Sequence, residues 1–170
     1  QIILSLCNSV AMCDKRVSEV LKLVTKDENF IDYKIQVHGK TERGDGYLGK
    51  VTFASVTGKT KNEDTKELNL VVKTSAENEL LRNELPIKRF FELEIYIYEK
   101  VIPTFTNFQQ EMGFESDILK SLPTCYFTRN FENNEALVLE NLKARGFEMA
   151  NRTIPLTFLQ VRLVLEGYGK

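Results

Sequence analysis

Residues 44–49 read Gly44-Asp45-Gly46-Tyr47-Leu48-Gly49, and this glycine-rich stretch decides the fold because segments with strand character flank it on both sides. Residues 30–38 and 50–56 each alternate apolar and polar side chains with a period of two, which predicts half-buried strands. The expected inward face of the first strand consists of Ile31, Tyr33, Ile35 and Val37. A third strand, residues 68–72, follows a polar turn at 58–65, so the three strands are expected to form an antiparallel meander.

The glycine spacing is G-x-G-x-x-G, which serves more than one fold. A dinucleotide-binding fold requires a helix immediately after the glycines, whereas residues 50–56 alternate as a strand does. In protein-kinase-like enzymes the same glycines cap a hairpin whose loop covers the ATP phosphates, and Gly44, Gly46, Gly49 and Val51 match that longer pattern. The alternative interpretation is a flexible hairpin tip without a ligand.

A lysine and a glutamate follow in the order that this interpretation requires. Lys73 ends an apolar strand, where a kinase places the lysine that contacts the α- and β-phosphates of ATP. Such a lysine needs a carboxylate from the next helix, and Glu94 is the candidate. The alternatives are a solvated strand end for Lys73 and an ordinary exposed helix charge for Glu94.

The segment around Glu94 is predicted to be a helix from about residue 85 to 101, stopped by Pro103. Residues 92–98 also alternate well enough for a strand, but the periodic region is long for a strand and ordinary for a helix. Two further helices are expected. One is capped by Asp14 and carries Val17, and the other is opened by Pro155.

Two more strands are predicted at residues 124–129 and 136–139. The second leads into Glu140-Asn141-Leu142, a polar turn after an apolar strand. At that place a kinase has the hinge that joins its lobes and binds adenine through backbone groups.

Together these motifs resemble the N-terminal half of the ecdysteroid-kinase-like family, which is found chiefly in insects and is related to choline and aminoglycoside kinases. The resemblance covers residue 30 to the end of the chain. The motifs that carry it are Gly44-Asp45-Gly46-Tyr47, Leu70-Val71-Val72-Lys73, Phe91-Glu92-Leu93-Glu94-Ile95-Tyr96, Tyr98-Glu99-Lys100-Val101-Ile102-Pro103, Leu122-Pro123-Thr124-Cys125-Tyr126, Leu137-Val138-Leu139-Glu140-Asn141-Leu142 and Arg145-Gly146-Phe147.

The resemblance implies an α+β fold, namely a protein-kinase-like N-lobe with a five-stranded antiparallel sheet and a C-type helix. Residues 1–29 would form an N-terminal helical extension, 30–143 the ATP-binding N-lobe, and 144–170 the start of a truncated C-lobe. The implied activity is transfer of the ATP γ-phosphate to a hydroxyl of a small metabolite, with ecdysteroids as the eponymous acceptors.

The resemblance also assigns roles to individual residues. Lys73 would bind the phosphates, Glu94 would orient Lys73, and Glu140 and Leu142 would meet adenine. Many members of the family have Asn where Gly46 stands, and a small polar residue near Gly49, so the phosphate loop departs from the family pattern.

The larger departure is an absent catalytic loop. Kinases of this fold use a His-x-Asp motif and later magnesium ligands, whereas His38 is the sole histidine and is followed by Gly39 and Lys40. No catalytic residue and no metal ligand is therefore expected in this segment, and the Mg²⁺ ligands would lie in a C-lobe supplied in cis. The segment is expected to be inactive alone, and the alternative is a non-catalytic kinase-like binding domain.

Composition narrows the other classes of function. The chain has 23 Lys plus Arg against 24 Asp plus Glu, so it has no basic excess for nucleic acid or an anionic membrane surface. The apolar residues 1–13 have no basic flank and are too short to span a bilayer. Three cysteines without metal-ligand spacing indicate reduced thiols and a cytoplasmic protein.

Overall fold

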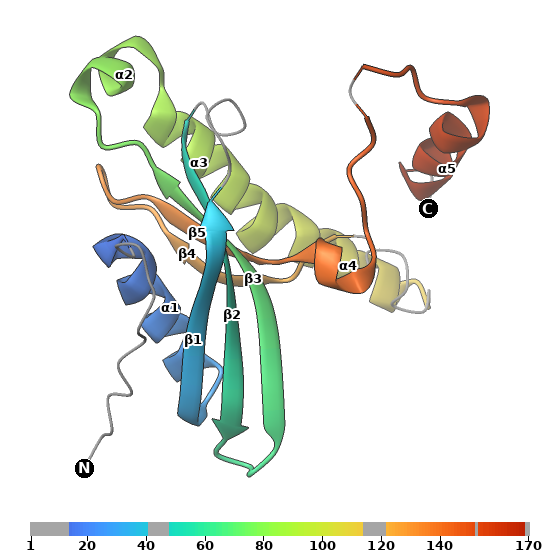
Figure 1. Cartoon of the computed structure of the whole chain (residues 1–170). Helices are drawn as coiled ribbons and strands as arrows, with labels where there is room; N and C mark the ends of the chain where they lie inside the picture. The colour runs from blue at the N-terminus through green and yellow to red at the C-terminus, as the bar shows by residue number, and fades with distance from the viewer. Residues whose placement is uncertain (1–13, 41–47, 114–121, 152, 169–170) are drawn as a thin grey trace.

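The computed structural model describes residues 14–40, 48–113, 122–151 and 153–168 (Figure 1). Its centre is a five-stranded antiparallel sheet with the strand order β1-β2-β3-β5-β4, which confirms the predicted α+β class and sheet. The strands are β1 (Phe30–Lys40), β2 (Gly49–Thr60), β3 (Thr65–Ser75), β4 (Cys125–Arg129) and β5 (Ala136–Glu140).

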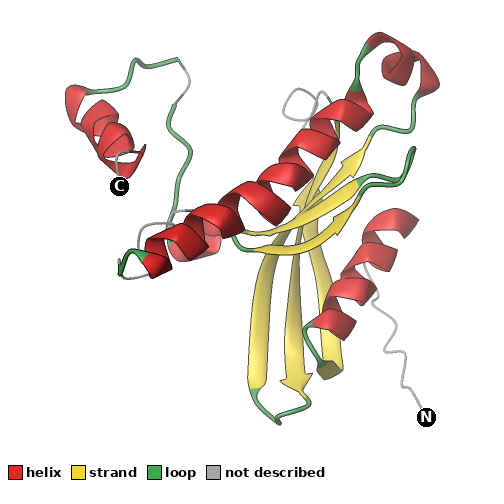
Figure 2. Ribbon diagram, turned by 180° about the vertical axis from the view of Figure 1, so that it is seen from behind, coloured by secondary structure: helices red, strands yellow, loops and turns green. Residues whose placement is uncertain are grey.

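Helices cover both faces of the sheet (Figure 2). Helix α1 (Lys15–Asp27) lies on one face, and its side chains join the main core with alternate residues of β3 and β5, among them Val72 and Val138. On the opposite face, Leu137 and Leu139 of β5 pack against Ile95. Because successive strand residues point to opposite faces, β5 is buried on both sides and anchors both helical layers.

Helix α1 begins where the sequence predicts. The Asp14 side chain accepts a hydrogen bond from the Arg16 backbone N–H and so caps the helix. The buried side chains of α1 recur at helical spacing and include Val17, Val20, Leu21 and Val24.

The helix on the second face of the sheet continues past Pro103 without a break. It consists of α3 (Ile87–Tyr96), the π-helical turn η1 (Ile97–Val101) and α4 (Ile102–Glu111). The expectation that Pro103 stops the helix is wrong, because Pro103 lies in the first turn of α4, where a missing N–H is tolerated. In the widened turn the Ile102 N–H donates to the Ile97 carbonyl. The alternative of a strand at residues 92–98 is also excluded.

Strand β1 departs from its predicted alternation at its start. The ladder with β2 is irregular between Phe30 and Asp32, so Phe30 is buried while Ile31 is 58% exposed. Tyr33 is exposed as well, and of the predicted inward face only Ile35 and Val37 pack against the core. A local bulge therefore turns Phe30 rather than Ile31 toward the core, and Tyr33 lies at the margin of the core with its ring against Phe30.

The hairpin between β2 and β3 is longer and tighter than predicted. Both strands continue to Thr60 and Thr65, so the turn is shorter than the expected residues 58–65. Gly58 belongs to β2, and a Cβ atom there would lie 2.1 Å from the Asp32 carbonyl oxygen. Gly58 thus serves the close approach of β1 and β2 rather than a turn.

The remaining helical segments are short or lie near the C-terminal end. They are α2 (Glu79–Glu84), the 3₁₀ turn η2 (Leu142–Arg145) and α5 (Phe158–Tyr168). Helix α5 begins three residues after Pro155, which corrects the expectation that Pro155 opens it. The Thr157 hydroxyl accepts from the Gln160 N–H while the Gln160 side chain accepts from the Thr157 N–H, which is a capping box. Within the described ranges, no helix is both long and apolar enough to cross a membrane.

Candidate functional site

An ion pair joins the sheet to the helix on its second face. The Lys73 Nζ on β3 donates to the Glu94 Oε1 on α3. The side chains of Lys73 and Glu94 are 33% and 34% exposed, so the pair remains accessible to a ligand. The structure brings together the two residues that the sequence singled out from segments 21 positions apart.

The pattern of β3 explains why Lys73 points to this face. Leu70, Val72 and Thr74 are buried toward α1, and the residues between them turn the other way. Lys73 pairs with Val51 of β2 on one side and with Leu137 of β5 on the other. The predicted site residue Val51 therefore lies beside the lysine in the same sheet.

Half-buried side chains back the ion pair. Tyr98 and Cys125 pack against Ile95, Leu137 and Leu139. Burial, and then the negative charge of Glu94, raises the pKa of Tyr98 to about 12. Burial, opposed by a backbone hydrogen bond of Phe127 and assisted by the charge of Glu99, raises the pKa of Cys125 to about 11. Both groups are uncharged at neutral pH, so neither competes with Glu94 for the ammonium group of Lys73.

At the end of β5 and directly after it, consecutive backbone N–H groups donate to different neighbouring segments. The Asn141 N–H donates to the Asn69 carbonyl of β3 at 2.7 Å, whereas the Glu140 N–H donates to the Thr124 carbonyl at 2.8 Å. The Glu140 carboxylate accepts from the Thr124 N–H at 3.1 Å and pairs with Arg145 at 3.4 Å. Protein groups therefore occupy the carboxylate and the N–H of Glu140, and the contact of Glu140 and Leu142 with a base stays a prediction.

The predicted glycine loop is only partly within the described structure. Gly44 and Gly46 lie outside the described residues. Gly49 begins β2 opposite Ser75, and a Cβ atom there would lie 2.0 Å from the Thr74 carbonyl oxygen. Gly49 therefore has a structural reason of its own, and its role in phosphate binding stays a prediction.

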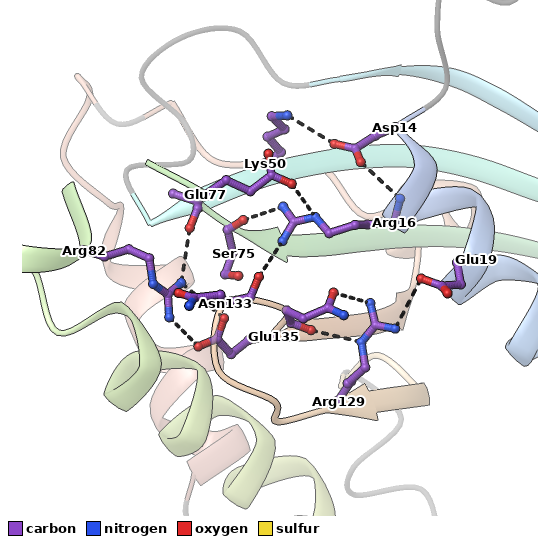
Figure 3. A network of polar contacts seen from close by, with 12 residues as sticks. Asp14, Arg16, Glu19, Lys50, Ser75, Glu77, Arg82, Arg129, Asn133 and Glu135 are labelled. Atoms are coloured by element: carbon purple, nitrogen blue, oxygen red, sulfur yellow. Dashed lines mark hydrogen bonds and ion pairs between the residues drawn. The ribbon is translucent and has the colours of Figure 1, made fainter. Parts of the chain in front are cut away.

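Sequence reasoning missed a polar network at the end of β3 (Figure 3). The Glu135 side chain is fully buried and accepts two hydrogen bonds from Arg82, at 2.6 and 3.2 Å. Burial raises the pKa of this carboxyl, but the hydrogen bonds and positive charge of Arg82 outweigh it and hold the pKa below the ordinary value. The available signal was a charged residue directly before an apolar strand.

Helix α1 reaches the same network from its own side. Arg16 donates to the Ser75 carbonyl at 2.7 Å and pairs with Glu77 at 3.0 Å. The Asp14 carboxylate accepts a hydrogen bond at 3.1 Å from the ammonium group of Lys50, the residue directly after Gly49. Charged groups therefore link the start of α1 to the start of β2 and the end of β3.

An antiparallel sheet with a lysine on its third strand, paired to a carboxylate of a helix later in the chain, is compatible with the N-lobe of kinase-like proteins. The sequence comparison gives the family: residues 43–170 match the model of the ecdysteroid kinase-like family, and the chain belongs to it. The match includes Lys73 and Glu94 and begins after α1 and β1. The comparisons with curated proteins and with solved structures gave no match.

Proposed function

We propose that this chain is the ATP-binding part of a small-molecule kinase. The observation that supports the proposal best is the ion pair between Lys73 and Glu94 on the face of the sheet opposite α1. Family membership supports a kinase-like phosphotransferase, and the ion pair gives that class a specific site.

Lys73 is the proposed ligand of the α- and β-phosphates. Its ammonium group is a compact charge with several donors, so it can bind phosphate oxygens while one N–H remains on Glu94. Glu94 holds the lysine in place, which lowers the entropy that must be lost when a phosphate binds. The partial exposure of both side chains leaves room for this contact.

The base and the phosphate loop take the remaining predicted residues. We assign adenine to the backbone of Glu140 and Leu142 because the Glu140 carboxylate is already paired with Arg145. Val51, opposite Lys73 in the ladder, is proposed to contact the nucleotide as well. Gly44, Gly46 and Gly49 are the proposed phosphate loop, in which absent side chains allow close approach of the backbone.

The proposed reaction transfers the γ-phosphate to a hydroxyl of a small metabolite, with an ecdysteroid as the candidate class. Magnesium, when bound, would neutralise charge on the phosphates. The sequence holds no His-x-Asp motif, since His38 precedes Gly39 and Lys40. We therefore propose that these 170 residues bind nucleotide without transferring phosphate, and that a C-lobe in cis supplies the acceptor-positioning Asp and the magnesium ligands.

Equilibrium binding of a fluorescent ATP analogue tests the proposal. Lys73→Ala removes charge-assisted hydrogen bonds to phosphate and is expected to weaken binding by about tenfold or more. Lys66→Ala is the matched control, because Lys66 lies on the same strand, pairs with Glu28 and is 39% exposed. Its affinity should equal that of the wild type.

Two results would contradict the proposal. Equal losses in both variants would show that the analogue responds to general charge rather than to the Lys73 site. Absence of saturable binding to the wild-type chain would favour the alternative, a non-catalytic kinase-like domain that binds another ligand.

A further inference from the structure

The connection between β3 and α3 has little apolar anchorage. It carries α2 (Glu79–Glu84), in which no residue is buried. The Asn78 side chain caps α2 by accepting from the Leu81 N–H. Since this connection leads directly into the helix that carries Glu94, whatever fixes α2 also restrains the start of α3.

Arg82 is the residue that fastens α2. Its guanidinium binds both oxygens of the fully buried Glu135 and also donates to the Ala76 carbonyl at 3.1 Å. The backbone carbonyl of Glu135 in turn accepts a hydrogen bond from the Ser75 N–H at 3.0 Å. Arg82 and Glu135 therefore tie three segments together: the end of β3, helix α2 and the turn before β5 (Figure 3).

The end of β3 is held from the other side as well. Arg16 of α1 donates to the Ser75 carbonyl and pairs with Glu77. The segment from Ser75 to Glu77 is thus gripped between two arginines, while Lys73 lies two residues upstream on the same strand. A displacement of α2 relative to this fixed strand end would move Glu94 relative to Lys73.

We propose that Arg82 and Glu135 are positioning residues that set the place of α3 so that Glu94 meets Lys73. Apolar contacts of α3, made by Ile87, Phe91 and Ile95, bury surface but specify rotation and translation weakly. A buried, doubly hydrogen-bonded ion pair is directional, and its net gain in stability over an apolar pair is small. The proposed role of the Arg82–Glu135 pair is to fix the position of α3 rather than to add stability. The consequence for nucleotide binding rests on the proposed function.

The reactivity of the Lys73 amine reports the geometry directly and needs no nucleotide. The 170-residue chain is treated with an amine-acylating reagent, and the modification of individual lysines is followed by peptide mass spectrometry. Arg82→Lys keeps the charge but cannot bind two carboxylate oxygens and a carbonyl with one planar group. Acylation of Lys73 is expected to accelerate by about threefold as its partly exposed ion pair is loosened.

Two controls separate positioning from general loosening. Lys66, on the same strand and paired with Glu28 at 2.5 Å, should keep its rate in Arg82→Lys. Arg89→Lys makes the same substitution at an exposed residue of α3 that pairs with Glu92 at 3.7 Å. It should leave Lys73 unchanged. If Arg82→Lys does not fold, Glu135→Gln replaces it, with the same readings.

Each outcome decides the proposal. Faster acylation of Lys73 alone supports it. Equal acceleration of Lys73 and Lys66 would show a merely structural pair, and an unchanged Lys73 would show that α3 is placed without Arg82. A parallel series with ATP tests the proposed function separately: protection of wild-type Lys73 supports nucleotide binding, and its absence leaves the ATP-free comparison intact.

Discussion

On one face of the sheet α1 buries an apolar stripe that includes Val20, Leu21 and Val24, each without exposed surface. On the other face Glu94 of α3 forms an ion pair with Lys73 of β3, and both side chains stay about one-third exposed. Burial of apolar area stabilises the fold, whereas an exposed ion pair contributes little to stability and remains available to a ligand. Stability and the proposed binding chemistry therefore belong to opposite faces of one sheet.

The largest expected effect concerns the α1 face. Leu21→Ala removes a fully buried side chain and should lower the free energy of unfolding by about 3 kcal/mol, through lost burial and a cavity. Urea-induced unfolding followed by circular dichroism measures the change. In the folded variant, the affinity for an ATP analogue should stay at the wild-type value.

Leu23→Ala is the matched control on the same helix, because Leu23 is 37% exposed. It should cost less than about 1 kcal/mol. Equal costs for the two substitutions would mean that the face assigned to the core is not the one that stabilises the protein.

An intermediate effect is expected at Gly49, where β2 pairs with β3 and the strand backbone supports both faces of the sheet. In Gly49→Ala the new Cβ atom would lie 2.0 Å from the Thr74 carbonyl oxygen, so β2 and β3 must separate locally. The free energy of unfolding should fall by about 2 kcal/mol.

Gly167→Ala is the control for that substitution, since a Cβ atom at Gly167 of α5 meets nothing within 4 Å. Its unfolding free energy should change by less than about 1 kcal/mol. A Gly49→Ala chain as stable as the wild type would show that the strands tolerate a wider spacing.

The smallest expected effect is the pH-dependent part of the Glu135 contribution. Its pKa is below the ordinary 4.5 in the folded protein. The stability that its charge provides is therefore fully present above pH 4.5 and is lost as the pH falls through the folded pKa. The difference in unfolding free energy between wild type and Glu135→Gln should shrink below pH 4.5.

Unfolding curves at several pH values test this sign. A difference that grows on acidification would mean that the folded protein raises the pKa of Glu135. Glu135 and Arg82 form a third region beside the two faces, because they connect the end of β3 to the α3 side of the sheet.

The strands and the pairing of Lys73 with Glu94 could be predicted because both follow from short patterns. Alternation sets which strand residues face α3, and the order of glycines, strand, lysine and helix specifies the partner. The start of β1 could not be predicted, since a bulge after Phe30 reverses the exposure of Ile31.

Two other features depended on contacts or geometry that a short sequence pattern does not specify. Arg82 and Glu135 are 53 positions apart, and neither belongs to a motif. Pro103 does not end the helix, because it directly follows the π-helical turn, where the backbone hydrogen-bond pattern changes. The capping box at Thr157, by contrast, was readable in the sequence and marks the start of α5 better than Pro155 does.

The family match begins at residue 43, yet α1 and β1 precede it and supply much of the core. A chain trimmed to the matched residues would leave Val56 and Leu70 facing water where α1 had covered them. It would also turn β2 into an edge strand with unpaired backbone groups, a template on which other chains can add. The boundary of the family match and the boundary of the packed core therefore fall at different residues.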